Sequence, residues 1–327
     1  MIYNGLCEIA DKFSTFIFDA YGVFWEGNGF YAGSLELMAD LVQQGKIVAV
    51  VSNSTALGET LRASYAKRGM IDGVHYNYMI SSGDLLCQSL IAGNICFTQC
   101  KNPQKYYVIG KPHSCAFIGT KYQQVENLQE ADFVYVGVPF VYADTVAKYT
   151  HLHEQFLPVR LDENGKVCEW DTLSAEPFEQ IVQQVADMGL PVLNANPDFT
   201  AKEGHCLIPD SKAAFVVRNG LITQMLRDKG CEILEFGKPH ANIYNFVFKR
   251  LTQDGIKIDK PKTCMIGDTI RTDVKGGLNA GIVPILCVET GVTAEAISGG
   301  QTVESLCLKE NIDIEKIIQI KSVGGKK

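Results

Sequence analysis

The segment Ser14–Val23 reads STFIFDAYGV, and the interpretation of the whole chain starts from it. Its first half is a short apolar run typical of a buried β-strand, and this run ends at a carboxylate, Asp19. Two further apolar runs end in polar groups in the same way: KIVAVV at 46–51 before Ser52, and TCMI at 263–266 before Asp268. Three buried strands that each end in a polar side chain predict a shared functional site.

Amphipathic helices alternate with these strands. The segment Ser34–Gln44 begins with a capping serine and places Met38 and Leu41 on one face, and His240–Leu251 carries a similar apolar stripe. The alternation predicts four more elements: helices at Leu57–Lys67 and Arg271–Asn279, and strands at Tyr78–Ser81 and Val283–Val288. Apolar strands between helices favour a parallel sheet covered on both faces, with ligand groups at the carboxyl ends of its strands. We therefore predict an α/β core with a Rossmann-like parallel sheet.

The middle of the chain, residues 85–235, has a βα pattern of its own. Its predicted strands are Tyr106–Ile109, Phe133–Val136, Val159–Leu161 and Pro191–Asn194, and its predicted helices are Thr145–Gln155 and Pro177–Met188. No low-complexity linker separates this stretch from its flanks, so we expect an α/β domain inserted into the first. The core then consists of residues 1–84 plus 236–327, and the tail Lys321–Lys327 is expected to fray.

Composition limits the classes of protein that the chain can represent. Of 327 residues, 46% are hydrophobic and 20% charged, the formal net charge is −7, and no long basic run occurs. A nucleic-acid groove or an anionic membrane surface is therefore not expected as a partner. The start, Met1–Lys12, lacks the pattern of a secretory signal, and most of the 11 cysteines lie in apolar runs. These features predict a cytoplasmic protein without a membrane span.

Four motifs follow one another in a fixed order. They are Asp19-Ala20-Tyr21-Gly22-Val23, Ser52-Asn53-Ser54, Lys238 before a helix, and the stretch from Gly267-Asp268 to Asp273. Each alone is ordinary, because strand-end Asp and Ser residues usually cap turns or helices. Together and in this order they resemble the haloacid dehalogenase-like (HAD) superfamily, and the insertion after the second motif resembles its NagD-like subclass IIA of sugar and nucleotide phosphatase relatives. The resemblance spans most of the chain and implies a large α/β cap of the C2 type.

The resemblance implies a Mg²⁺-dependent hydrolase of sugar, nucleotide or aryl phosphates. Asp19 would attack phosphorus and form an acyl phosphate. Mg²⁺ prefers hard oxygen ligands, and Asp19, Asp268 and the backbone carbonyl of Tyr21 would supply them. Asp273 would either bind the metal or orient water on it.

The remaining motif residues are expected to handle the anion. Ser52 and Asn53 would bind phosphoryl oxygens, and Lys238 would neutralise the nucleophile and the charge that develops during transfer. A second Gly-Lys-Pro-His contains Lys111, but only Lys238 lies in the expected order before Asp268. In the cap, Asn196 and Asp198 are expected either to select a small phosphorylated metabolite or simply to cap a Pro-containing turn. The subclass often forms homodimers through its caps.

Tyr21 is the main departure from the family pattern. HAD phosphatases usually carry a second Asp at this position, which protonates the leaving oxygen and then activates water. Tyrosine, with an ordinary pKa near 10, is a poor base at neutral pH. Two alternatives therefore stand beside the phosphatase: a protein that binds a phosphorylated metabolite with very weak hydrolysis, and a 2-haloacid dehalogenase. The dehalogenase alternative does not explain Asp268 and Asp273, because these acidic residues form a metal-binding motif and displacement of halide at carbon needs no metal.

Overall fold

The computed structural model describes residues 2–27, 29–111, 116–139, 159–161, 167–170, 175–203 and 214–325. The chain folds into two compact units. Unit 1 combines Met1–Ser82 with Gly237–Lys327, and unit 2 is Gly83–Phe236. The predicted helix Thr145–Gln155 lies outside the described residues. Among the described residues, no helix has the length and apolar character needed to cross a membrane.

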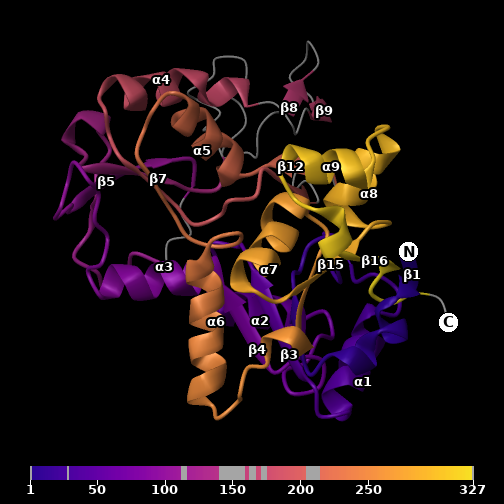
Figure 1. Cartoon of the computed structure of the whole chain (residues 1–327). Coiled ribbons are helices and arrows are strands. Elements are labelled where there is room, and N and C mark those ends of the chain that lie inside the picture. The colour runs from indigo at the N-terminus through magenta and orange to yellow at the C-terminus, as the bar shows by residue number, and fades with distance from the viewer. Residues whose placement is uncertain are drawn as a thin grey trace. The chain divides into compact units, whose positions relative to one another are not determined.

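Unit 1 is built on a seven-stranded parallel sheet (Figure 1). In spatial order its strands are β1 (Ile2–Gly5), β16 (Ile318–Ser322), β15 (Val283–Cys287), β14 (Thr263–Gly267), β2 (Thr15–Phe18), β3 (Ile47–Ser52) and β4 (Tyr78–Ser81). In the centre, Ile17 of β2 is in register with Met265 of β14 and Ala49 of β3. The three strands that carry the sequence motifs are therefore direct neighbours.

Helices cover both faces of this sheet. They are α1 (Ser34–Gln43), α2 (Gly58–Ala66), α6 (Ala241–Gln253), α7 (Lys275–Ala280), α8 (Gly291–Ser298) and α9 (Val303–Lys309). Successive strand residues face opposite sides, so Phe16 and Phe18 share a core with Met38 of α1. Leu286 of β15 belongs to a different core, together with Val303 of α9. This explains why the strands read as continuous apolar runs.

Unit 2 contains a second parallel sheet. Its order is β13 (Ile233–Glu235), β10 (Val192–Asn194), β7 (Phe133–Val136), β5 (Lys105–Ile109) and β6 (Gln123–Gln124). Two helices pack together, α4 (Glu179–Asp187) and α5 (Asn219–Asp228), and they share a core with the valines of β7 and β10. A third helix, α3 (Ser82–Ile91), begins where β4 ends, and β11 (Thr200–Glu203) pairs with β12 (Ala214–Val217). The strands β8 (Val159–Leu161) and β9 (Val167–Trp170) form a separate pair.

The predicted parallel α/β architecture is confirmed, and the differences are local. The segment predicted as the helix Arg271–Asn279 begins as a π-helix, Ile270–Val274, and continues as α7. The prediction that the tail frays is wrong for residues 321–325, which are packed within unit 1. Ile318–Ser322 pairs with β1, so both ends of the described chain lie side by side in Figure 1, and Val323 is buried. A side chain at Gly325 would collide with the backbone of Asn4, so glycine permits this close packing.

Candidate active site

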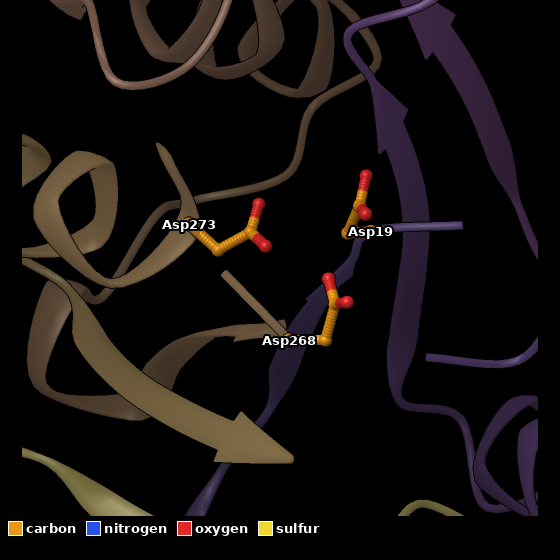
Figure 2. Close-up of side chains that lie close together, drawn as sticks. All are labelled: Asp19, Asp268 and Asp273. Carbon is orange, nitrogen blue, oxygen red and sulfur yellow. The ribbon is translucent and has the colours of Figure 1, made fainter. Parts of the chain in front are cut away.

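Three carboxylates meet at the carboxyl ends of the central strands of unit 1 (Figure 2). Asp19 follows β2, Asp268 follows β14, and Asp273 lies in the π-helix after β14. One oxygen from each of the three side chains lies within 4.8 Å of the others. Strand pairing holds them together, because the backbone N–H of Asp19 donates to the carbonyl of Ile266 at 2.8 Å, just before Asp268.

Asp268 is held in one orientation by the start of α8. Its Oδ2 accepts a hydrogen bond from the backbone N–H of Val292 at 2.5 Å, and its Oδ1 accepts from the hydroxyl of Thr269 at 3.1 Å. The hydroxyl of Thr293 donates to the backbone carbonyl of Asp268, also at 2.5 Å. The first turn of a helix presents unpaired N–H groups, and these stabilise a negative side chain. Asp268 is thus preorganised in a buried position.

Two glycines leave room for this carboxylate. Gly22 and Gly291 have positive φ angles of 76° and 63°, and a Cβ added to either would lie 2.1 or 1.8 Å from Oδ2 of Asp268. The hydroxyl of Thr290 donates to the carbonyl of Gly22 at 2.6 Å and links the two segments. The sequence analysis did not single out Gly291 or Thr293. The one feature of the sequence that could have identified them is their position directly after the predicted strand Val283–Val288, where site residues are expected.

Lys238 lies between the other two carboxylates. Its Nζ is 2.5 Å from Oδ1 of Asp19 and 2.8 Å from Oδ1 of Asp273. The lysine side chain is 1% exposed, whereas that of Asp19 is 14% exposed. A buried ammonium needs such partners, because an unpaired buried charge is strongly unfavourable. Asp273 is fixed further by the N–H of Thr269, which donates to its Oδ2 at 3.1 Å.

The charge balance of this cluster favours a divalent cation. Burial raises the pKa of the Asp268 carboxyl well above its ordinary value, and repulsion from Asp273 and Asp19 adds to the increase. Three carboxylates face one lysine, so the cluster carries excess negative charge whenever all three are ionised. A cation bound among them would offset both burial and repulsion. Clustered carboxylate oxygens are the donor set that Mg²⁺ prefers, and the residues present therefore fit this metal.

Ser52 and Asn53 stand at the end of β3, next to β2. The hydroxyl of Ser52 is buried and accepts a hydrogen bond from the N–H of Ser54 at 3.2 Å. The side chain of Asn53 contacts the backbone of Lys238. Its Oδ1 accepts a hydrogen bond from the backbone N–H of Lys238 at 2.7 Å, and its Nδ2 donates to the backbone carbonyl of Lys238 at 3.1 Å. Nothing in the sequence pattern indicated this contact, which joins residues 185 positions apart.

Tyr21 packs against the apolar core of unit 1, close to a second phenol that the sequence analysis missed. This is Tyr65 of α2, which stacks edge-on with Phe24 and Trp25 at ring separations of 5.7 and 5.6 Å. Burial raises the pKa of Tyr65 well above its ordinary value, and the neighbouring Tyr21 and Asp19 add to the increase. The phenol of Tyr65 is therefore a poor base at neutral pH.

The other residues singled out in the sequence lie in unit 2. Lys111 is exposed, in contrast to buried Lys238. After β10, the N–H of Asn196 donates to Oδ1 of Asn194 at 3.0 Å, and the N–H of Asp198 donates to Oδ1 of Asn196 at 3.1 Å. These consecutive turns give the Asn196 oxygen a local capping role, while Asp198 is half-buried.

The parallel α/β fold with acidic groups at its central strand ends agrees with what family models find in the sequence. Two family models match its two ends: a haloacid dehalogenase-like hydrolase model over residues 16–120 and a HAD-hydrolase-like model over residues 235–304. The chain belongs to the haloacid dehalogenase-like hydrolases. The predicted family and the prediction of an enzyme are confirmed.

Relatives of known name resemble most of the chain. Phosphoglycolate phosphatase 1A, chloroplastic, of Arabidopsis thaliana is 25% identical over 291 residues, which cover 88% of this chain and 71% of the relative. The 4-nitrophenylphosphatase of Schizosaccharomyces pombe is 23% identical over 294 residues, covering 88% and 87%. A solved haloacid dehalogenase-like hydrolase from Brucella suis 1330 superposes with a TM-score of 0.71 at 19% identity, covering 98% of each chain. That likeness confirms the fold class.

Proposed function

We propose that this protein is a Mg²⁺-dependent phosphate-monoester hydrolase that acts through an aspartyl phosphate on Asp19. The observation that carries the proposal is the cluster of Asp19, Asp268 and Asp273 around buried Lys238. The names of the relatives, phosphoglycolate phosphatase and 4-nitrophenylphosphatase, support phosphate esters as substrates. The cluster also favours phosphoryl transfer over dehalogenation, which has no use for three clustered carboxylates.

The three carboxylates differ in exposure, and this difference supports different roles for them. Asp19 is the most exposed of the three, whereas Asp268 and Asp273 are almost fully buried. An oxygen of Asp19 would form a bond to phosphorus as the bond from phosphorus to the leaving oxygen breaks. Water would then attack the acyl phosphate and release inorganic phosphate. Lys238, which contacts Asp19, would hold this carboxylate in position and neutralise charge on the transferred group, and Ser52 would bind a phosphoryl oxygen.

Mg²⁺, when bound, would stabilise the phosphoryl charge and reduce repulsion between the substrate and the carboxylates. Asp268 and Asp19 would hold it, together with the backbone carbonyl of Tyr21, and Asp273 would bind it or orient its water. The hydrogen bonds from Val292 and Thr269 hold the Asp268 side chain in one orientation, which supports its proposed role as a ligand.

Tyr21 supports a second candidate, a protein that binds a phosphorylated metabolite and turns it over very slowly. Acyl-phosphate formation tolerates a missing acid when the leaving group is good, but water attack on the intermediate needs a base. A general acid or base usually contributes about 10²–10⁴-fold to a rate. Aryl phosphates should therefore be better substrates than alkyl phosphates, and Tyr21→Asp should raise the rate of intermediate hydrolysis.

Unit 2 is proposed as the cap that selects a small phosphorylated metabolite. Asp198 is the better of the two predicted specificity residues, because it is only half-buried whereas Asn196 is buried. Pairing of two copies through this unit stays a prediction.

The first experiment is a panel of phosphorylated metabolites and 4-nitrophenyl phosphate, assayed for phosphate release with Mg²⁺ and with chelator. We expect release that requires Mg²⁺ and that Asp19→Asn abolishes while circular dichroism stays unchanged. Full activity in Asp19→Asn would disprove the nucleophile. Binding without release would favour the second candidate, and chelator-insensitive chloride release from a 2-haloacid would favour a dehalogenase.

A further inference from the structure

Asn53 contacts the backbone of Lys238 through both ends of its side-chain amide. Its Oδ1 accepts from the N–H of Lys238 at 2.7 Å, and its Nδ2 donates to the carbonyl of the same residue at 3.1 Å. Both residues are 1% exposed. One side chain therefore pairs with the donor and the acceptor of a single buried residue, as a neighbouring strand would.

The surroundings explain why this pairing matters. Lys238 follows Gly237, whose φ is 106°, and precedes α6, which begins at Ala241, so it lies outside regular secondary structure. A buried peptide group that loses a hydrogen bond destabilises the fold, so the pairing by Asn53 helps to fix this part of the backbone. Ser82, fully buried, donates its hydroxyl to Oδ1 of Asn53 at 3.4 Å and adds a second support.

We propose that the side chain of Asn53 is a positioning residue for Lys238 and does not itself bind the phosphoryl group. The backbone of Lys238 sets where its Nζ can reach, and that nitrogen contacts Asp19 and Asp273 together. A chain of contacts thus runs from Ser82 through Asn53 and Lys238 to the proposed nucleophile. The inference rests on the proposed function and adds to it a residue that acts through the lysine.

A double-mutant cycle tests this with 4-nitrophenyl phosphate and Mg²⁺. Asn53→Ala should lower kcat by about 10–100-fold, since a misplacement of about 1 Å can cost that much, and should change KM little. In a Lys238→Met background the same change should alter kcat/KM by less than about twofold, because residues that act through one another are not additive. Multiplied losses in the double variant, or a raised KM with unchanged kcat in Asn53→Ala, would overturn the inference.

Asn77 supplies the matched control. Its Oδ1 accepts from the backbone N–H of Val48, and its own N–H donates to the Val48 carbonyl, both at 2.8 Å on the same strand β3. Asn77→Ala should cost stability without changing kcat. If Asn53→Ala does not fold, Asn53→Asp replaces it in the cycle, because it keeps the acceptor for the Lys238 N–H and loses the donor, although it also adds an ionisable carboxyl group.

A crystal structure of the Asn53 variant separates this inference from the proposed function. We expect Nζ of Lys238 to lose contact with Asp19 and Asp273. If that nitrogen stays in place, the inference is wrong whether or not the protein hydrolyses a phosphate ester. If it moves in a protein that hydrolyses none, the positioning role stands and the proposed function fails.

Discussion

The chain contains Gly-Lys-Pro-His twice, at residues 110–113 and 237–240, and the two lysines have opposite environments. Both have a paired backbone: Lys111 exchanges two 2.8 Å hydrogen bonds with the backbone of Val138, and Lys238 is paired by the side chain of Asn53. Lys111 is exposed, whereas Lys238 is buried between Asp19 and Asp273. The identical local sequence does not define the site. Carboxylates from distant strands do.

Replacing each lysine in turn is the most direct test of whether only Lys238 belongs to the site. Lys238→Met removes the positive charge between two carboxylates, and we expect kcat/KM to fall by about 10²–10³-fold, the loss typical of one electrostatic contact in a transition state. Lys111→Met should change it by less than about twofold, since exposed substitutions are usually near neutral. Steady-state kinetics on 4-nitrophenyl phosphate measures both, and equal losses in the two variants would contradict the assignment.

Mg²⁺ should stabilise the region around Lys238 and not the region around Lys111. Binding at 100 times the dissociation constant adds about 2.7 kcal/mol to stability. Hydrogen exchange should therefore show that Mg²⁺ protects the amides of β14 and of the segment Ile270–Val274 and leaves those of β5, next to Lys111, unchanged. Asp268→Asn should abolish the protection. Equal protection in β5, or protection that survives in Asp268→Asn, would show that the ion binds elsewhere.

Two buried threonines, one at the site and one in unit 2, allow a closely matched pair of substitutions with the smallest expected effect. The hydroxyl of Thr293 donates to the carbonyl of Asp268, and that of Thr223 in unit 2 donates to the carbonyl of Asn219; both side chains are buried. Changing either to Val should cost about 1 kcal/mol in the free energy of unfolding, measured by denaturation. Only Thr293→Val should also weaken Mg²⁺ binding in calorimetry. A matching loss in Thr223→Val would show that general stability, and not the Asp268 contact, controls the metal.

The parts of the site that follow local rules were predictable. β2, β3 and β14 are continuous apolar runs, and the carboxyl ends of parallel strands must meet, so Asp19, Ser52 and Asp268 were expected near one another. Lys238 could be chosen over Lys111 only through the order of the family motifs, because both lie in the same tetrapeptide.

The rest depends on contacts between distant residues that leave no periodic signal. Asn53 resembles a turn residue until its partner Lys238 is known. β1 has an exposed and mixed pattern, so it becomes a strand only because β16 pairs with it. The π-helix at Ile270–Val274 places Asp273 beside Lys238. The spacing of apolar residues in the sequence does not distinguish this π-helix from the first turn of an ordinary α-helix.

The pairing of β2 with β14 also affects how the protein is made. β2 ends at Phe18 and its partner begins at Thr263, with all of unit 2 between them. At about 5–20 residues per second, a ribosome needs roughly 12 to 50 s to reach β14 after completing β2. During that interval the strand that carries Asp19 has one unpaired edge, and open edges invite pairing with other chains. We expect chains halted before residue 263 to need a chaperone to stay in solution, however well unit 2 has already folded.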